Sequence, residues 1–145
     1  MIGLLQRVSG ASVSVDGRVI GAIDRGLMVL VAVHRDDNER DVARLAERIL
    51  GYRVFPDTEG RMNRSVRDES GGLLLVPQFT LAADTRKGTR ASFTRAAPPE
   101  KGSEYFDRLV EICRRELGHV ETGAFGANMQ VSLVNDGPVT FWLES

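Results

Sequence analysis

Residues 11–34 read ASVSVDGRVIGAIDRGLMVLVAVH, and this stretch decides the fold class. Apolar and polar residues alternate up to Asp16-Gly17, which is a preferred pair for the two-residue turn of a β-hairpin. The run from Gly26 to Val33 is then apolar without interruption, which is typical of a strand buried on both faces. We therefore predict a hairpin followed by a central strand.

Two later segments carry apolar residues at helical spacing. Asp36 with Glu39 predicts a capping box at the start of a first helix, and Gly51 suits its end. Pro98-Pro99 predicts the start of a second helix, which would end at Gly118. The expected buried positions are Val42, Leu45, Ala46, Ile49 and Leu50 in the first helix, and Tyr105, Phe106, Leu109, Val110, Cys113 and Leu117 in the second.

The remaining apolar segments are shorter and predict strands. GGLLLVPQFTL (71–81) is expected to form another central strand, and MQVSLVN (129–135) and VTFWLES (139–145) are expected to close the chain. Strands outnumber helices in this reading. We predict one α+β domain over residues 1–145, with a curved, barrel-like, mainly antiparallel sheet and two covering helices.

Composition limits the class of protein. Apolar residues make up 42% and charged residues 27%, as in ordinary globular domains. The one cysteine excludes an internal disulfide, and no apolar run approaches the ~20 residues that span a membrane. We expect a cytoplasmic protein without a membrane partner. Two distant histidines and one cysteine form no ligand cluster, so we expect no metal site and no cofactor.

The net charge of −1 is unevenly distributed. Residues 85–99, TRKGTRASFTRAAPP, contain Arg86, Lys87, Arg90 and Arg95 and no acidic residue. Upstream, residues 60–67 add three more arginines. Such a segment is either a solvated loop or a contact for a nucleic-acid backbone, and charge alone leaves both open.

Few side chains are candidates for a catalytic nucleophile or base. Cys113 lies on an apolar stripe and is expected to be a buried structural thiol. His34 and His119 have no serine or cysteine nearby in sequence to activate. Thr80 is a candidate nucleophile, but Gln78 cannot accept its proton and Asp84 is the nearest acid. Either Thr80 attacks with a partner from elsewhere, or backbone dipoles and the substrate itself do most of the work.

Several motifs in order resemble the D-aminoacyl-tRNA deacylases, also called D-tyrosyl-tRNA deacylases. They are MIGLLQRVSGASVSVDG (1–17), RMNRSVRDESGGLLL (61–75), VPQFTLAAD (76–84) and GAFGANMQVSLVNDGPVTFWLES (123–145). The resemblance implies a homodimeric editing hydrolase with active sites at the interface. Its substrate would be D-aminoacyl-tRNA, and mischarged glycyl-tRNA as well. A non-catalytic tRNA-binding module is the alternative.

The resemblance also implies roles for particular residues. Gly137-Pro138 would be a Gly-cisPro motif that one protomer inserts into the active site of its partner, where it rejects L-aminoacyl groups by steric exclusion. Backbone N–H groups of Phe79 and Thr80 would hold the ester carbonyl oxygen. Gln78 would lie beside the terminal ribose, whose 2′-hydroxyl assists hydrolysis.

The same resemblance implies an RNA-binding surface. Phe125, Gly126 and Met129 would line the pocket for the terminal adenine, although core packing is an alternative for Phe125 and Met129. The basic loop with Arg86, Lys87 and Arg90 would contact acceptor-stem phosphates. The chain departs from the family pattern in two places, with Pro77 where serine is usual and Ala82 where tyrosine is common.

Overall fold

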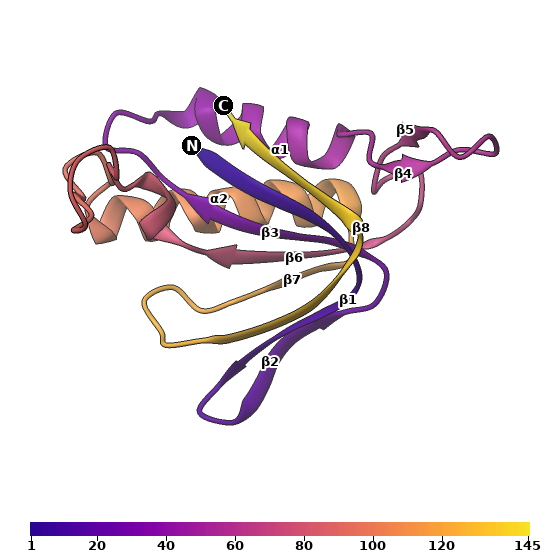
Figure 1. The fold of residues 1–145 in the computed structure, drawn as a ribbon, viewed down its shortest axis with the longest axis horizontal. Coiled ribbons are helices and arrows are strands. Elements are labelled where there is room, and N and C mark those ends of the chain that lie inside the picture. The colour runs from indigo at the N-terminus through magenta and orange to yellow at the C-terminus, as the bar shows by residue number, and fades with distance from the viewer.

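The computed structural model describes all residues from 1 to 145 (Figure 1). The elements in chain order are β1 (Ile2–Val15), β2 (Arg18–Ile23), β3 (Gly26–Ala32), α1 (Glu39–Gly51), β4 (Phe55–Pro56), β5 (Met62–Arg64), β6 (Gly72–Pro77), the 3-10 helix η1 (Phe79–Ala82), α2 (Pro99–Leu117), β7 (Val120–Thr122) and β8 (Gln130–Glu144). No helix is long and apolar enough to cross a membrane.

The main sheet is built around the long strand β1. The strand order is β2-β1-β3-β6-β7, with β8 also paired to β1, and β4 and β5 form a separate small pair. All three pairings of β1 are antiparallel, whereas β3 with β6 and β6 with β7 are parallel. The sheet is strongly curved: a side chain on Gly21 of β2 would meet the carbonyl oxygen of Thr122 on β7 at 2.9 Å. The predicted α+β class with a barrel-like sheet is confirmed.

The predicted hairpin forms where the sequence places it. Val15 of β1 pairs with Arg18 of β2, and the two turn residues between them have positive φ angles, 50° at Asp16 and 78° at Gly17. Such angles match the twist of the flanking strands, and Asp and Gly adopt them readily.

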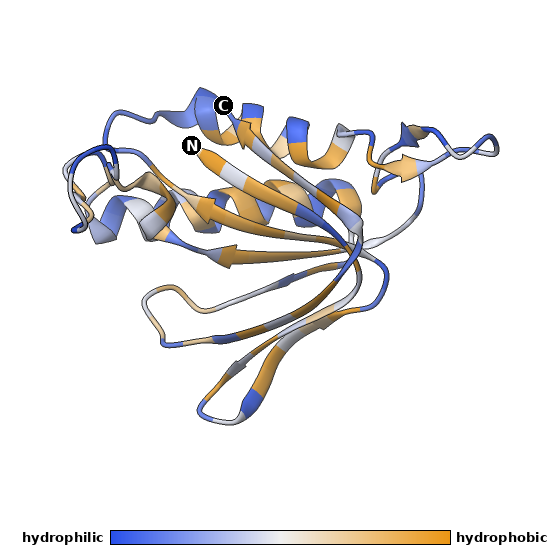
Figure 2. Ribbon diagram, in the orientation of Figure 1, coloured by the Kyte–Doolittle hydropathy of each residue, from blue (hydrophilic) through white to orange (hydrophobic).

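Both helices lie on the same face of the sheet, and β3 and β6 beneath them are apolar along most of their length (Figures 1 and 2). All five predicted positions of α1 are buried there. In α2, Phe106, Leu109, Val110 and Cys113 are buried, while Tyr105 and Leu117 are partly buried at the edge of this core. A second, smaller core lies inside the curl of the sheet and includes Val8, Val13, Met28, Leu74 and Val76.

The first helix begins two residues later than predicted. Its N-cap is Asn38, whose side chain accepts the N–H of Arg40, and the capping box is closed by Asp41. Asp36 and Glu39 do not form the predicted box. The carboxylate of Asp37 instead accepts hydrogen bonds from the Met1 ammonium and the His34 N–H. A short turn therefore precedes the helix, and Asn38 caps it.

Two strand predictions also need correction. β6 ends at Pro77 and not at Leu81, because the chain turns into the 3-10 helix η1 after Gln78. The two closing strands are one strand, β8, which follows β1 along almost its whole length.

Candidate active site

A cavity of about 500 Å³ opens where the carboxyl ends of β3 and β6 meet the start of α2. Its floor comes from Val31 and Ala32 of β3 and Phe106 of α2. Pro77 borders it at the point where β6 ends. The lining is mainly apolar, which suits the flat face of an aromatic ring in a ligand.

Three phenylalanines that are partly exposed form the sides of this cavity. Phe79 and Phe93 pack against each other with ring centroids 5.2 Å apart and ring planes tilted by 51°, and Phe125 and Gly126 lie on the loop between β7 and β8. Phe79 is 56%, Phe93 44% and Phe125 38% exposed. Apolar rings gathered at an open cavity mark a binding surface more than a folding core.

Gly102 of α2 is the reason that Phe125 can lie so close to the helix. A Cβ at this buried position would lie 3.2 Å from Cζ and 3.4 Å from Cε2 of Phe125. The glycine therefore leaves the room that the aromatic ring occupies.

The 3-10 turn after β6 places two backbone donors beside the cavity. The Gln78 N–H donates to Val31 O at 2.7 Å, which ties the turn to β3. Within η1 the N–H of Leu81 donates to Gln78 O and that of Ala83 to Thr80 O. The N–H groups of Phe79 and Thr80 come before Leu81, the first donor of this turn, and have no partner within it. Such a pair can hold an oxygen that becomes negatively charged.

No side chain near Thr80 is placed to act as its base. Its exposed hydroxyl accepts a hydrogen bond from the Gln78 amide. Asp84 is bound by Arg86, whose Nε, terminal nitrogen and backbone N–H donate to the carboxylate at 2.9, 2.6 and 3.0 Å. These hydrogen bonds hold the pKa of Asp84 well below its usual range, so the carboxylate is a weak proton acceptor.

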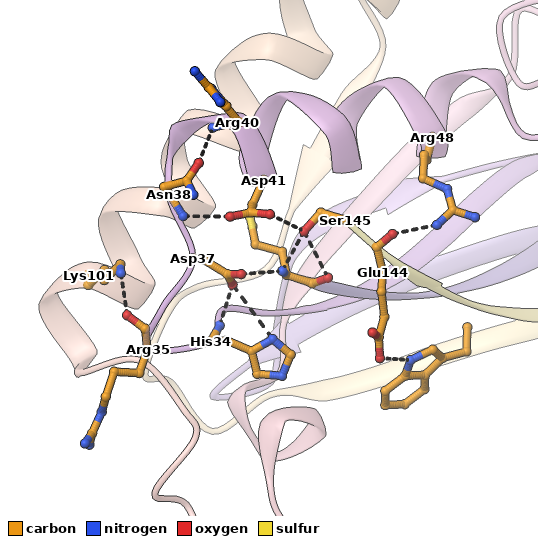
Figure 3. Close-up of polar contacts among 12 residues, drawn as sticks. His34, Arg35, Asp37, Asn38, Arg40, Asp41, Arg48, Lys101, Glu144 and Ser145 are labelled. Atoms are coloured by element: carbon orange, nitrogen blue, oxygen red, sulfur yellow. Dashed lines mark hydrogen bonds and ion pairs between the residues drawn. The ribbon is translucent and has the colours of Figure 1, made fainter.

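The other titratable candidates lie away from the cavity. Cys113 is fully buried, and burial raises the pKa of its thiol to about 12. No cluster of three or more His, Cys, Asp or Glu side chains could hold a metal ion. The His34 N–H is part of a network that joins Asp37, Asp41 and Ser145 to the amino terminus (Figure 3).

Gly137 and Pro138 do not form a hairpin turn but bulge out of β8. Asn135 pairs with Val8 and Thr140 with Gln6, so four residues of β8 lie opposite Arg7 alone. The Gly137–Pro138 peptide bond is cis, and both residues are exposed. The bulge therefore presents backbone, and no large side chain, at the surface.

Arg7 and Asn135 hold this bulge, and sequence reasoning missed both. Arg7 donates from Nε to Asp136 O at 2.9 Å and from a terminal nitrogen to Val54 O at 2.6 Å. Asn135 accepts the Val139 N–H at 2.7 Å and donates to Val139 O at 3.2 Å. One signal was available: Arg7 is a charged residue within the otherwise largely apolar strand IGLLQRV (2–8).

One protomer does not bring the bulge to its own cavity. Arg7 pairs with Leu27 on β3, whereas the cavity begins at Val31, four residues or about 13 Å further along that strand. Met129 also lies elsewhere: it packs against the second core and its sulfur accepts the Ala124 N–H at 3.4 Å.

Most of the predicted basic surface is paired. Arg61, Arg64 and Arg67 form ion pairs with Glu59, Glu69 and Glu116, and Arg86 is held by Asp84. Lys87 and Arg90 are exposed and form no ion pair. They lie on the loop that the Asp84–Ser92 bridge closes.

A sequence profile of the family described as D-Tyr-tRNA(Tyr) deacylase matches residues 4–144. This chain belongs to that family. Relatives named D-aminoacyl-tRNA deacylase from Alkalilimnicola ehrlichii and Pseudomonas aeruginosa are 66% and 59% identical to it. Both alignments cover 100% of this chain, and they cover 97% and 100% of the relatives.

Two solved structures have the same fold as this D-Tyr-tRNA(Tyr) deacylase family member. One, described as a c-Myc DNA unwinding element binding protein, has a TM-score of 0.95 and 38% identity over 100% of this chain and 99% of that one. The other, described as a probable eukaryotic D-amino acid tRNA deacylase, has a TM-score of 0.88 and 18% identity over 99% of this chain and 98% of that one.

Proposed function

We propose that this protein is an editing hydrolase that cleaves the ester between a D-amino acid and the 3′ end of tRNA. Relatives that are 59% and 66% identical to this chain over its whole length are named D-aminoacyl-tRNA deacylase, which supports the proposal. The observation that carries the proposal is the juxtaposition of an apolar, aromatic-sided cavity with two free backbone donors at Phe79 and Thr80.

In this proposal the cavity holds the terminal adenosine. The adenine ring lies among Phe79, Phe125 and Gly126, where stacking on an aromatic ring is worth about 1–3 kcal/mol. Met129 supports the Phe125 loop from the second core and does not contact the base. The cavity volume of about 500 Å³ lies within the usual range for a small-molecule site.

The ester carbonyl would lie beside η1. The N–H groups of Phe79 and Thr80 hold its oxygen as negative charge develops during attack. Gln78 lies beside the ribose, and the 2′-hydroxyl of the terminal adenosine assists the attacking water. The low basicity of Asp84 argues against Thr80 as a covalent nucleophile, since a hydroxyl nucleophile needs a base within reach.

Chirality would be selected by the bulge of a second protomer. Gly137 and Pro138 are exposed, held by Arg7 and Asn135, and remote from the cavity of their own chain. The outer edge of β8 is unpaired, and Val134 and Trp142 on this strand are exposed apolar residues that a partner would cover. On these grounds we propose a homodimer with two shared sites.

Lys87 and Arg90 are the cations of the basic loop that remain free to meet acceptor-stem phosphates. Arg86 would contribute only if it left Asp84. A tRNA substrate is consistent with a cytoplasmic location.

Deacylation of matched D- and L-aminoacyl-tRNA by the purified protein tests this proposal. We expect release of the D-amino acid and survival of the L-ester. A protein that binds tRNA and releases neither amino acid would be a binding module, and equal release of both would remove the chirality filter.

Glycyl-tRNA and L-alanyl-tRNA together test how small a side chain the Gly137-Pro138 backbone excludes. A backbone wall excludes a side chain, and glycine has none, so glycyl-tRNA should be hydrolysed while L-alanyl-tRNA, with one methyl group more, is spared. Rapid loss of the L-alanyl ester, or complete inertness toward the glycyl ester, would contradict exclusion by Gly137-Pro138.

A further inference from the structure

Arg35 is the one charged residue among those that line the cavity. It lies three residues beyond the end of β3 and is exposed, and its guanidinium forms no ion pair or hydrogen bond within the chain. It also lines an adjoining polar hollow of about 360 Å³, together with Thr94, Arg95 and three aspartates, Asp36, Asp37 and Asp41. Arg35 thus stands at the boundary between an apolar pocket and a polar groove.

The backbone holds Arg35 and Arg95 opposite each other. His34 and Ala96 form an isolated antiparallel bridge, and the Arg35 N–H donates to Arg95 O at 2.9 Å. Residues directly opposite in such a pair have Cβ atoms about 5 Å apart, and like charges there destabilise the pairing. Lys101 adds a third cation nearby, since its ammonium donates to Arg35 O at 2.5 Å.

Neither guanidinium group forms an ion pair with a carboxylate, although Asp36, Asp37 and Asp41 line the same hollow. Asp37 is engaged by the Met1 ammonium and the His34 N–H. Asp41 is engaged by the Asn38 N–H and the Ser145 hydroxyl. In Figure 3 the Arg35 side chain points away from both of these carboxylates.

Four other arginines of the basic segments are paired, whereas Arg90 is not. Arg61, Arg64, Arg67 and Arg86 are each paired with an acid. Arg35 at the rim of the cavity and Arg95 in the adjoining hollow thus lie opposite each other along the backbone without a carboxylate partner. A bound anion would relieve this repulsion.

We propose that Arg35 and Arg95 bind the phosphodiester that joins the terminal adenosine to the preceding nucleotide of the tRNA. This inference rests on the proposed function, because it requires adenosine in the cavity. The 5′-phosphate of that adenosine must leave an apolar pocket at its rim, where Arg35 is the only charge. Guanidinium groups match phosphate oxygens with paired hydrogen bonds, and two of them can share one phosphate.

The test compares two substrates that differ in this phosphate. One is D-aminoacyl-tRNA, and the other is the 3′-D-aminoacyl ester of adenosine, which lacks any phosphate. For the double variant Arg35→Ala/Arg95→Ala, kcat/KM should fall about tenfold or more on the tRNA and stay within twofold on the adenosine ester. The logarithmic salt slope for tRNA should flatten by about 0.7, the value for one phosphate of a single strand.

Arg115→Ala is the matched control, since Arg115 is exposed and lies about 24 Å from the first residue of α2. It should leave both substrates unchanged. Equal losses of kcat/KM on both substrates would mean that the two arginines shape the cavity. An unchanged kcat/KM on D-aminoacyl-tRNA would mean that they do not bind the phosphate. Either result overturns the inference. Inertness of the unaltered protein toward both D-esters would instead refute the proposed function, and the phosphate site with it.

Discussion

Replacing Gly102 with alanine should separate the stability of this protein from its activity. Gly102 lies inside α2, where alanine is favoured over glycine by up to about 1 kcal/mol. The added Cβ would lie 3.2 Å from Cζ of Phe125, so the ring has to move by a few tenths of an ångström. Phe125 is 38% exposed on a loop and can move without opening the core. We therefore expect the free energy of unfolding to be unchanged or higher by up to about 1 kcal/mol.

The same movement should weaken substrate binding. A base stacked on an aromatic side chain gains about 1–3 kcal/mol, and displacing the ring should forfeit at least ~1 kcal/mol of this. That corresponds to a fall of about fivefold or more in kcat/KM. Gly102→Val, which adds a larger branched side chain, should cost more activity.

Thermal unfolding and steady-state kinetics on the 3′-D-aminoacyl ester of adenosine measure the two effects. Gly51→Ala is the control, because Gly51 is the last residue of α1 and an added Cβ there meets nothing within 4 Å. It should leave kcat/KM unchanged. If Gly102→Ala kept kcat/KM within twofold of the unaltered protein, Phe125 would not be part of the binding surface. A large loss of stability would show that the glycine serves packing alone.

The remaining predictions concern single side chains. Thr80→Ala should keep substantial kcat, because no base activates its hydroxyl; abolished turnover in a folded variant, with an acyl-enzyme trapped in the unaltered protein, would restore the nucleophile hypothesis. Arg7→Met should lower the free energy of unfolding by about 2 kcal/mol, since it leaves the buried carbonyl of Val54 without its donor, and it should relax discrimination against L-alanyl-tRNA. Chemical denaturation measures the stability of this variant, and deacylation of L-alanyl-tRNA measures its selectivity. Unaltered selectivity would show that Arg7 does not position the bulge. Asp84→Asn should release Arg86 and steepen the logarithmic salt slope of tRNA binding by up to about one unit, whereas an unchanged slope would mean that Arg86 does not reach RNA.

Features that depend on neighbouring residues were predictable from the sequence. The Asp16-Gly17 turn needs only two residues that tolerate positive φ, and its place was correct. The burial of β3 and of the apolar stripe of α1 follows from periodicity, because periodicity decides which face of an element can leave water. The strand β6 was predicted to extend to Leu81, because the apolar run continues past Pro77, but it ends at Pro77.

The start of α1 was decided by distant atoms. Asp36, Asp37 and Asn38 are all competent caps by residue type. The Met1 ammonium, 36 residues away, engages Asp37, and Asn38 caps the helix. Local preference offered three nearly equal choices, and the contact with Met1 removed Asp37 from them.

The sequence by itself determined the elements, their buried faces and, through its motifs, the family. Tertiary structure alone decided that Phe79, Phe93 and Phe125 share one cavity, that four residues of β8 bulge opposite Arg7, and that Arg35 and Arg95 lie opposed and unpaired. The physical reason is that periodicity and turn chemistry act over a few residues. Contacts between distant segments depend instead on strand register and on where each loop returns to the sheet.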